Sequence, residues 1–192
     1  MITGLNSYLG NRIEAYLKQY NQKTGEERYQ IEKISLRNGL PENADFGTYD
    51  TILHVAGIAH VDISGLTEEE RKEYYRVNCD LAIETAKKAR QDGCRQFVYF
   101  SSVIVYGDGG KEVKRHITKE TPLFSDNCYG GSKIRAEEGL RNLSTDDFCA
   151  AILRIPFVYG PDCRGNYNFL RKIAGLVPVF PDYPNQRSMI FV

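Results

Sequence analysis

Short apolar runs alternate along the chain with longer amphipathic stretches. The runs at 51–57, 96–102 and 148–156 are continuous enough to predict buried strands, and the first two end in small residues. Residues 29–37 alternate more weakly and are a fourth candidate. The apolar start at 1–3 comes directly before a glycine-containing turn, so it predicts a short first strand.

Three of the stretches between these runs have the period of a helix. Residues 8–20 carry apolar side chains at helical spacing, and residues 68–92 begin with a Thr67 cap and an acidic first turn. Residues 127–143 form a third predicted helix. Strands that alternate with helices indicate parallel strands joined by crossovers, so we expect a doubly wound, Rossmann-like α/β sheet. Such sheets bind ligands at the carboxyl ends of their strands.

The composition changes after Pro161. Residues 161–192 are rich in proline, glycine and asparagine and no longer repeat the strand–helix unit. We therefore predict one α/β domain over 1–160 and the beginning of a second, smaller region over 161–192.

The composition excludes several classes of protein. Of the 192 residues, 42% are hydrophobic, which is enough for a sizeable core, and 25 basic side chains balance 25 acidic ones. No basic surface therefore indicates a nucleic-acid partner, and no apolar segment is long enough to span a membrane. The five cysteines form no C-x-x-C pair, so we expect no metal site and reduced thiols in a cytoplasmic protein.

Two Tyr-x-x-x-Lys pairs occur, and their contexts differ. Tyr129 and Lys133 fall in a predicted helix, where residues four apart lie about 5–6 Å from each other at Cβ. Tyr29 and Lys33 fall in a strand pattern, which separates them by about 13 Å. A cation beside a phenol brings its pKa toward neutrality, as acid/base catalysis requires. Only the pair in the helix is therefore a candidate for catalysis.

Two other segments place candidate groups at strand ends. Ser102 follows the strand at 96–102, where a hydroxyl can bind a substrate oxygen; the alternative, a small residue that merely ends a strand, stays open. The segment TGLNSYLG matches a G-x-x-G-x-x-G turn at Gly4 and Gly10, with Ser7 in place of the middle glycine. Glycines in such a turn let backbone N–H groups approach a pyrophosphate at a helix N-terminus, whereas the serine Cβ restricts that approach.

Together these segments resemble the extended short-chain dehydrogenase/reductases, the NAD-dependent nucleotide-sugar epimerase/dehydratase group. The resemblance covers nearly the whole chain, and the motifs follow the family's order. They are TGLNSYLG at 3–10, HVAG at 54–57, the helix around Asn78, SSVIVYG at 101–107, YGGSK at 129–133 and LRIPFVYGP at 153–161. Residues 163–174 and 185–192 further resemble the subset related to UDP-glucose 4-epimerase and sugar 4-ketoreductases.

The resemblance implies a role for each matching residue. Tyr129 would be the general acid/base at the sugar hydroxyl, Lys133 would hold its phenolate and the cofactor ribose, and Ser102 would bind the reacting oxygen. Asn168 and Arg187 would contact the diphosphate of a nucleotide sugar. NAD or NADP would lie against Gly4, Ser7, Tyr8, Leu9, Gly10, Arg37, His54, Ala56, Gly57, Asn78, Tyr129 and Lys133, and no metal is implied. We expect Arg154 to be structural.

Three features depart from the family pattern. Ser7 replaces a glycine, and the usual acidic residue after the second strand is missing. Arg37 lies near that place and can accept a 2′-phosphate, which favours NADP. Both ends are short for the family, so we expect a chain that is truncated at both ends, lacks most of its substrate pocket and is inactive by itself.

The resemblance implies an NAD(P)-dependent nucleotide-sugar epimerase of the UDP-sugar 4-epimerase kind, or a fragment of one. The first alternative is an NADP-dependent nucleotide-sugar 4-ketoreductase or dehydratase, and the second is a non-catalytic dinucleotide-binding protein. The resemblance also implies a homodimer for the complete protein, in which residues 68–92 and 127–143 of each subunit form a four-helix bundle.

Overall fold

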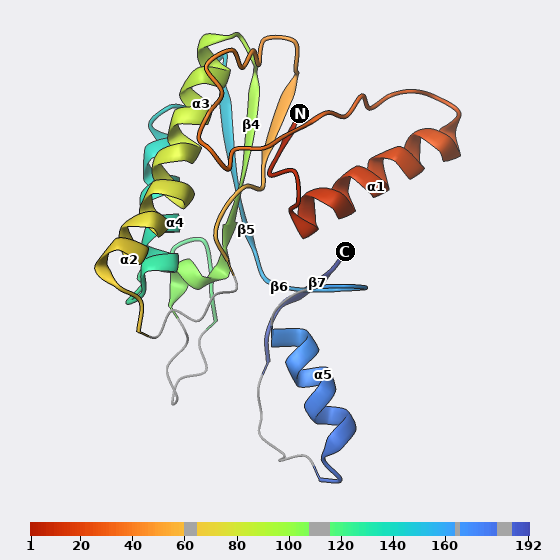
Figure 1. Cartoon of the computed structure of the whole chain (residues 1–192), viewed down its shortest axis with the longest axis vertical. Coiled ribbons are helices and arrows are strands. Elements are labelled where there is room, and N and C mark those ends of the chain that lie inside the picture. Colours follow the sequence, from red (N-terminus) through yellow and green to blue (C-terminus); the bar gives the residue numbers. More distant parts are fainter. Residues whose placement is uncertain (60–64, 108–115, 164–165, 180–185) are drawn as a thin grey trace.

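The computed structural model describes residues 1–59, 65–107, 116–163, 166–179 and 186–192. A five-stranded parallel sheet carries α2, α3 and α4 on one face and α1 on the other (Figure 1). Its strands are β1 (Ile2–Thr3), β2 (Lys33–Ile34), β3 (Thr51–His54), β4 (Gln96–Ser102) and β5 (Cys149–Ile155). The helices are α1 (Tyr8–Thr24), α2 (Glu68–Tyr75), the π-helical turn η1 (Arg76–Asp80), α3 (Leu81–Gln91), the 3₁₀ turn η2 (Val103–Tyr106) and α4 (Cys128–Arg141). The predicted doubly wound α/β sheet is therefore confirmed.

The strands lie in the order β2-β1-β3-β4-β5. The chain passes outward from β1 to β2 and then returns to the other side of β1 for β3, so the order reverses between β1 and β3. Ligands of open α/β sheets bind outside the carboxyl ends of the strands at such a reversal. The topology therefore places the candidate crevice next to the residues that follow β1 and β3.

The lengths of the strands differ from the predictions at the β2 edge. β4 matches the predicted strand, and β5 falls inside the predicted 148–156. β2 covers only Lys33–Ile34 of the predicted 29–37, because its sole partner β1 has two residues, Ile2 and Thr3, with which it can pair. β3 stops at His54 instead of residue 57 because the chain turns there toward the β1–α1 turn.

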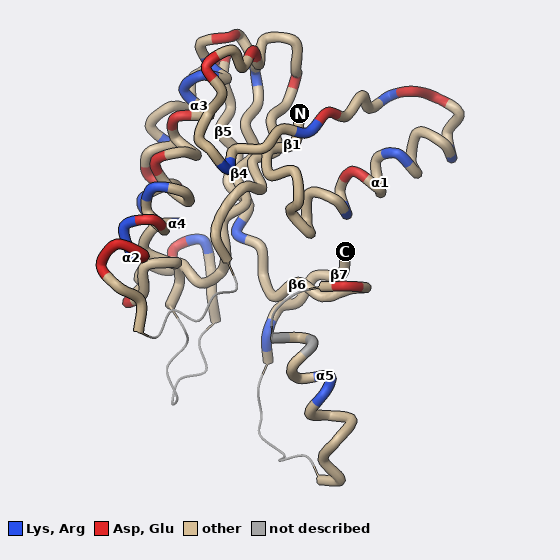
Figure 2. Tube along the Cα trace, viewed as in Figure 1, with Lys and Arg blue, Asp and Glu red and all other residues tan. Residues whose placement is uncertain are grey.

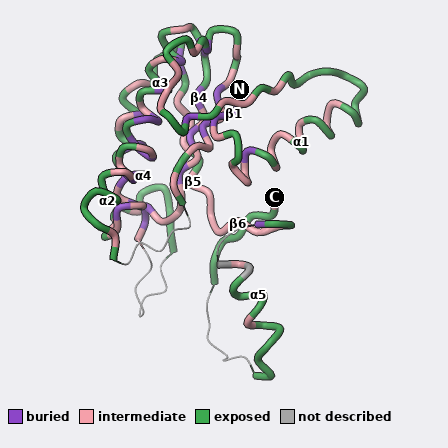
Figure 3. Tube along the Cα trace, viewed as in Figure 1, coloured by how far each residue is buried: buried purple, intermediate pink, exposed green. Residues whose placement is uncertain are grey.

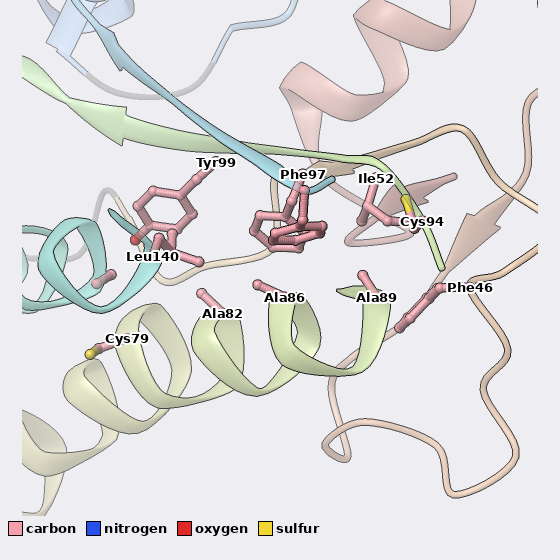
Figure 4. Close-up of a cluster of buried hydrophobic side chains, with 12 residues drawn as sticks. Phe46, Ile52, Cys79, Ala82, Ala86, Ala89, Cys94, Phe97, Tyr99 and Leu140 are labelled. Carbon is pink, nitrogen blue, oxygen red and sulfur yellow. The ribbon is translucent and has the colours of Figure 1, made fainter. Parts of the chain in front are cut away.

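The main core lies between the sheet and α3 and α4. Phe97 and Tyr99 point from β4 toward Ala82 and Ala86 of α3, and all four side chains have no exposed surface (Figure 4). The small alanines let α3 approach the aromatic rings closely. Figure 3 shows the buried residues gathered on this inner face, while the outer helix faces and α5 are exposed. Each fully buried large side chain contributes about 1.5–3 kcal/mol to stability.

The predicted helix over 68–92 is interrupted by the π-helical turn. It begins as predicted at Thr67, whose hydroxyl accepts from the Glu70 N–H, while the Glu70 carboxylate accepts from the Thr67 N–H. The turn η1 carries Asn78, and the hydroxyl of Tyr99 donates to the Asn78 carbonyl at 2.7 Å. This bond ties the wide turn to β4 below it. π-helical turns inside α-helices often occur at functional sites.

The glycines of YGGSK have a packing role. A Cβ on Gly131 would lie 2.5 Å from the Tyr75 hydroxyl oxygen, so the Tyr75 side chain of α2 packs against α4 at this glycine. α4 itself begins at Asn127, whose side chain accepts from the Gly130 N–H at 2.8 Å. Figure 2 shows basic and acidic residues of both signs along α2, α3 and α4.

The last part of the chain builds a separate small unit. β6 (Phe157–Tyr159) pairs in parallel with β7 (Met189–Phe191), and α5 (Asn166–Leu176) lies between them in sequence. The Tyr159 ring contacts the Phe191 ring edge-on at 5.4 Å between centroids. The Tyr8 hydroxyl on α1 donates to the Pro161 carbonyl at 2.8 Å and so links this unit to the main sheet. Among the described helices, none is both long enough and apolar enough to cross a membrane.

Candidate functional site

The turn between β1 and α1 lies at the carboxyl end of β1, beside the reversal of strand order. Gly4 has a φ of 87°, and a Cβ there would lie 3.1 Å from the Ala56 Cα, so this position requires glycine. Ser7 has a φ of −66°, which any residue adopts, and its hydroxyl caps α1 by accepting from the Gly10 N–H at 3.2 Å. The serine that replaces the middle glycine is therefore unstrained. Tyr8, Leu9 and Gly10 form the first turn of α1, with only Gly10 fully buried.

The segment after β3 forms the opposite side of the crevice. A Cβ on Gly57 would lie 2.9 Å from Asn78 Oδ1 and 3.6 Å from Lys133 Nζ. The buried Asn78 amide accepts from the Ile58 N–H at 2.7 Å and donates to the Ile58 carbonyl at 3.1 Å. Asn78 also donates to Ser132 Oγ at 3.3 Å. One asparagine in the π-helical turn thus holds the β3 segment against α4.

His54 lies behind the crevice. Its side chain is fully buried, with Nδ1 3.2 Å from Thr3 Oγ1 and the ring 5.3 Å from the Phe97 ring. Burial lowers the pKa of His54 to about 3, so the imidazole is neutral at physiological pH. The structure places this predicted cofactor residue in the packing of the sheet rather than at the crevice surface.

Ser102 and Tyr129 are brought together at the carboxyl end of β4. The Ser102 hydroxyl accepts from the Ile104 N–H at 3.3 Å, which starts η2, and it lies near the Tyr129 phenol. Burial raises the pKa of Tyr129, and the neighbouring Ser102 hydroxyl opposes that rise. The Tyr129 ring meets the Tyr74 ring edge-on at 6.4 Å between centroids. The phenol is consequently protonated at neutral pH in this structure.

Lys133 is buried one helical turn along α4, with only 6% of its surface exposed. Its Nζ donates to the Phe100 carbonyl at 2.9 Å and lies 4.6 Å above the Tyr99 ring. Burial lowers the pKa of Lys133 from 10.5 to about 8, although the Glu137 carboxylate acts to raise it. The expected lowering of the Tyr129 pKa by Lys133 is not seen, because the ammonium is engaged by β4 instead of by the phenol.

The other predicted site residues lie farther out. Arg37 is exposed just after β2, with its N–H 3.4 Å from Ser35 Oγ. Arg187 is exposed just before β7. Asn168 is in α5, and its side chain lies outside the described part of the structure. Tyr29 and Lys33, the pair set aside in the sequence, have different partners: Lys33 pairs with Glu14 at 3.1 Å, and the Tyr29 backbone bonds to Asn21.

Sequence reasoning missed one charged group next to the site. Glu137 on α4 has no exposed surface and forms ion pairs with Arg154 at 2.6 Å and Arg141 at 2.8 Å. The sequence does indicate that Glu137 lies on the same side of α4 as the pair, because it follows Lys133 by the same four residues that separate Lys133 from Tyr129. The expectation that Arg154 is structural agrees with this ion pair. Within the described residues, no cluster of three or more His, Cys, Asp or Glu side chains is arranged to hold a metal.

Comparisons with known proteins agree with this geometry. The model of the NAD-dependent epimerase/dehydratase family matches residues 1–179. N-acetyl-α-D-glucosaminyl-diphospho-ditrans,octacis-undecaprenol 4-epimerase of Escherichia coli O157:H7 is 27% identical over 187 residues, which cover 91% of this chain and 54% of the relative. UDP-glucose 4-epimerase of Vibrio cholerae is 29% identical over 145 residues, which cover 73% of this chain and 44% of the relative. The chain thus spans about half the length of these curated relatives.

Solved structures show the same fold. UDP-glucuronic acid 4-epimerase from Bacillus cereus, solved with UDP-4-deoxy-4-fluoro-glucuronic acid and NAD, matches with a TM-score of 0.70 at 17% identity. The match covers 99% of this chain and 68% of that one.

Because the Lys133 ammonium is buried, we predict that the free energy of unfolding depends on pH. The unfolded chain holds this proton up to about pH 10.5 and the folded chain only up to about pH 8, so the contribution of Lys133 to stability rises as the pH increases between these values. We expect Lys133→Met to be more stable than the wild type at pH 7 by about 1–3 kcal/mol, after the loss of the bond to Phe100 is subtracted. The gain should shrink as the pH rises from about 8 to about 10.5.

Urea unfolding at pH 7 and pH 10 measures this difference. Lys18→Met is the matched control, because the Lys18 side chain is 60% exposed on α1 and its removal should leave the pH dependence unchanged. A Lys133→Met protein that is less stable than the wild type at pH 7 would contradict the prediction.

Proposed function

The chain belongs to the NAD-dependent epimerase/dehydratase family, and on this premise we propose that it carries the catalytic site of an NAD(P)-dependent nucleotide-sugar 4-epimerase. The observation that carries the proposal is the convergence of Ser102, Tyr129 and Lys133 at the carboxyl end of β4, beside the reversal of strand order. The 4-epimerases among its relatives support the reaction type.

The residues at the crevice fit a dinucleotide. Gly4 and Gly57 let the segments after β1 and β3 pack closely against Ala56 and Asn78, which brings the main chain on both sides of the strand reversal to the place where a dinucleotide would bind. The N-terminus of α1 lies beside Gly4 and favours a pyrophosphate. When bound, the nicotinamide supplies the hydride acceptor and donor. Lys133, which lies next to Gly57, would hold the adjacent ribose.

The proton steps belong to residues of this chain. Tyr129 would take the proton from the sugar 4-hydroxyl when the carbon is oxidised and return it on reduction. Ser102, which lies near Tyr129, would bind the same sugar oxygen and keep it aligned with the phenol. Lys133 would move part of its bonding from Phe100 toward the phenolate, which lowers the pKa of Tyr129 toward the working pH.

The small unit of β6, α5 and β7 is proposed to begin the substrate-binding region, so that the domain boundary falls near residue 160. Arg187 is exposed in this unit and would pair with the diphosphate of the substrate, and Asn168 of α5 would lie beside it. The substrate would be a UDP-sugar, as for the relative from Vibrio cholerae. A cytoplasmic location follows from the availability of nucleotide sugars there and is part of the proposal.

A loss of turnover in Tyr129→Phe tests the acid/base role. In purified protein carrying this chain, the change should lower interconversion of UDP-glucose and UDP-galactose by about 10²–10⁴-fold, because the phenyl ring cannot exchange a proton. Binding of NADH, followed by its fluorescence, should stay close to the wild-type value. Tyr16→Phe is the control, since Tyr16 is 66% exposed on α1.

The substrate panel for this assay also includes a polyprenyl-diphosphate-linked amino sugar, the substrate class in the name of the relative from Escherichia coli. Net consumption of NADPH without a returned epimer would indicate a reductase. Near-native turnover by Tyr129→Phe would remove Tyr129 from the acid/base role.

From the position of Arg37 we predict which cofactor the protein prefers, NADP(H) or NAD(H). We expect NADP(H) to bind at least as well as NAD(H), because the Arg37 guanidinium is exposed after β2, where it would meet a 2′-phosphate. Arg37→Ala should weaken NADP(H) by about tenfold or more and leave NAD(H) unchanged. Calorimetric titration of both cofactors, with Arg28→Ala as an exposed control, measures this. A preference for NAD(H) that Arg37→Ala does not alter would exclude the role.

We also propose that the complete protein is a homodimer formed through the outer faces of α2, α3 and α4, which lie side by side in Figure 1. Ala86 of α3 and Leu140 of α4 have no exposed surface and belong to the core, so they face the sheet and not a partner. The contact would therefore use the charged outer surface and partly buried side chains such as Ile134. Light scattering at micromolar concentration should give twice the monomer mass, and a monomer mass would contradict the proposal.

A further inference from the structure

Glu137 is the centre of a buried ionic network beside the candidate catalytic pair. The carboxylate has no exposed surface and accepts from the Ser101 hydroxyl at 2.6 Å. The Arg154 guanidinium reaches both of its oxygens, at 3.0 Å and 3.1 Å from Nε and 2.6 Å from Nη2. Arg141 adds a bond at 2.8 Å. Every oxygen of this buried charge is therefore bonded, as a buried carboxylate requires.

The network joins the elements that carry the candidate site. Glu137 and Arg141 belong to α4, Ser101 to β4 and Arg154 to β5. Arg154 also donates to the Tyr106 hydroxyl of η2 at 2.5 Å and lies 5.0 Å above its ring. One carboxylate thus connects the helix of Tyr129 and Lys133 to the strand that ends at Ser102.

The four-residue spacing along α4 places Glu137 on the same side of the helix as the candidate catalytic residues. Tyr129, Lys133 and Glu137 follow one another every four residues, so they lie along one stripe of the helix. The far end of this stripe is held to Ser101, which is adjacent in sequence to Ser102. A rotation or slide of α4 would break the bonds of Glu137 and would displace Tyr129 from Ser102 at the same time.

We propose that Glu137 is a positioning residue, which holds the Tyr129–Lys133 stripe of α4 in register with Ser102 through its bonds to Ser101, Arg154 and Arg141. The inference rests on the proposed function for the chemistry that is positioned. The positioning itself is a property of the cofactor-free fold and can be measured separately.

The Glu137 carboxylate also acts electrostatically on the Lys133 ammonium. The groups around the Lys133 ammonium are the Phe100 carbonyl and Tyr99 ring of β4, the neutral His54 of β3, and Glu137 on its own helix. Glu137 is the anion that raises the pKa of Lys133 against the effect of burial. Loss of this charge therefore makes Lys133 release its proton at lower pH.

The test labels the lysine Cε carbons with ¹³C and follows their NMR signals against pH, with the Lys133 signal assigned by Lys133→Arg. Glu137→Gln should shift the Lys133 signal and move its titration midpoint below the wild-type value near 8. Glu138→Gln is the matched control, because Glu138 is the next residue on the same helix and is exposed. It loses the same charge and should leave the Lys133 signal unchanged.

Turnover adds a second readout. Glu137→Gln should lower kcat by about 10²-fold, as for a reacting group displaced by about 1 Å, with little change in KM. Glu137→Asp, which keeps the charge, should recover part of the loss and of the Lys133 midpoint. If the wild type shows no turnover of any sugar, the proposed function fails, and the NMR titration still decides the positioning role.

If Glu137→Gln does not fold, Ser101→Ala is the second variant with which the same NMR experiment is carried out. This change removes one neutral hydrogen bond and leaves the ion pairs, so it should shift the Lys133 signal more than Glu138→Gln does. A Lys133 signal and midpoint in Glu137→Gln, or in Ser101→Ala, that match those of Glu138→Gln would overturn the proposal.

Discussion

The buried ammonium of Lys133 is the constraint on which the rest of the candidate site depends. A charge with 6% exposure loses most of its hydration, which costs several kcal/mol unless other groups replace the water. The Phe100 carbonyl, the Tyr99 ring and the Glu137 carboxylate supply that replacement from two elements, β4 and α4. The lowered pKa shows that the replacement is incomplete. The fold therefore keeps a cation where packing alone would favour an apolar side chain, as catalytic sites do.

Close approach of backbone segments makes this burial possible. The π-helical turn places Asn78 so that its amide holds the segment after β3, and Gly57 then fits between Asn78 and Lys133. On the other side, Gly4 lets the β1–α1 turn meet Ala56. Gly131 does the same for α2 and α4. The glycines of the recognised motifs thus serve the close packing of the segments around the candidate site.

The sequence predicted the sheet, the helix of the Tyr129–Lys133 pair and the rejection of Tyr29–Lys33, because hydrophobic period and four-residue spacing are local properties. It did not predict the π-helical turn, since the bond from Tyr99 to Asn78 that ties the turn to β4 joins residues 21 positions apart. It missed Glu137 for the same reason: the buried charge is explained by Ser101 of β4 and Arg154 of β5, which are distant from it in the sequence. The burial of His54 and the short β2 likewise depend on partners across the sheet, which no local pattern reveals.

The protonation of the pair connects this geometry to catalysis. An ammonium has three N–H donors, and within the described residues one of them bonds to protein, at Phe100. Two donors are then available for a ribose hydroxyl and for the phenol of Tyr129. While they lack those partners, burial keeps the phenol protonated and makes Lys133 a weaker base. A ligand that bonds to Lys133 favours its charged form, and the charged form in turn favours the phenolate. In the proposed function, the base would thus become active only when cofactor and substrate are in place, and the same burial that destabilises the free site would restrict proton transfer to the assembled one.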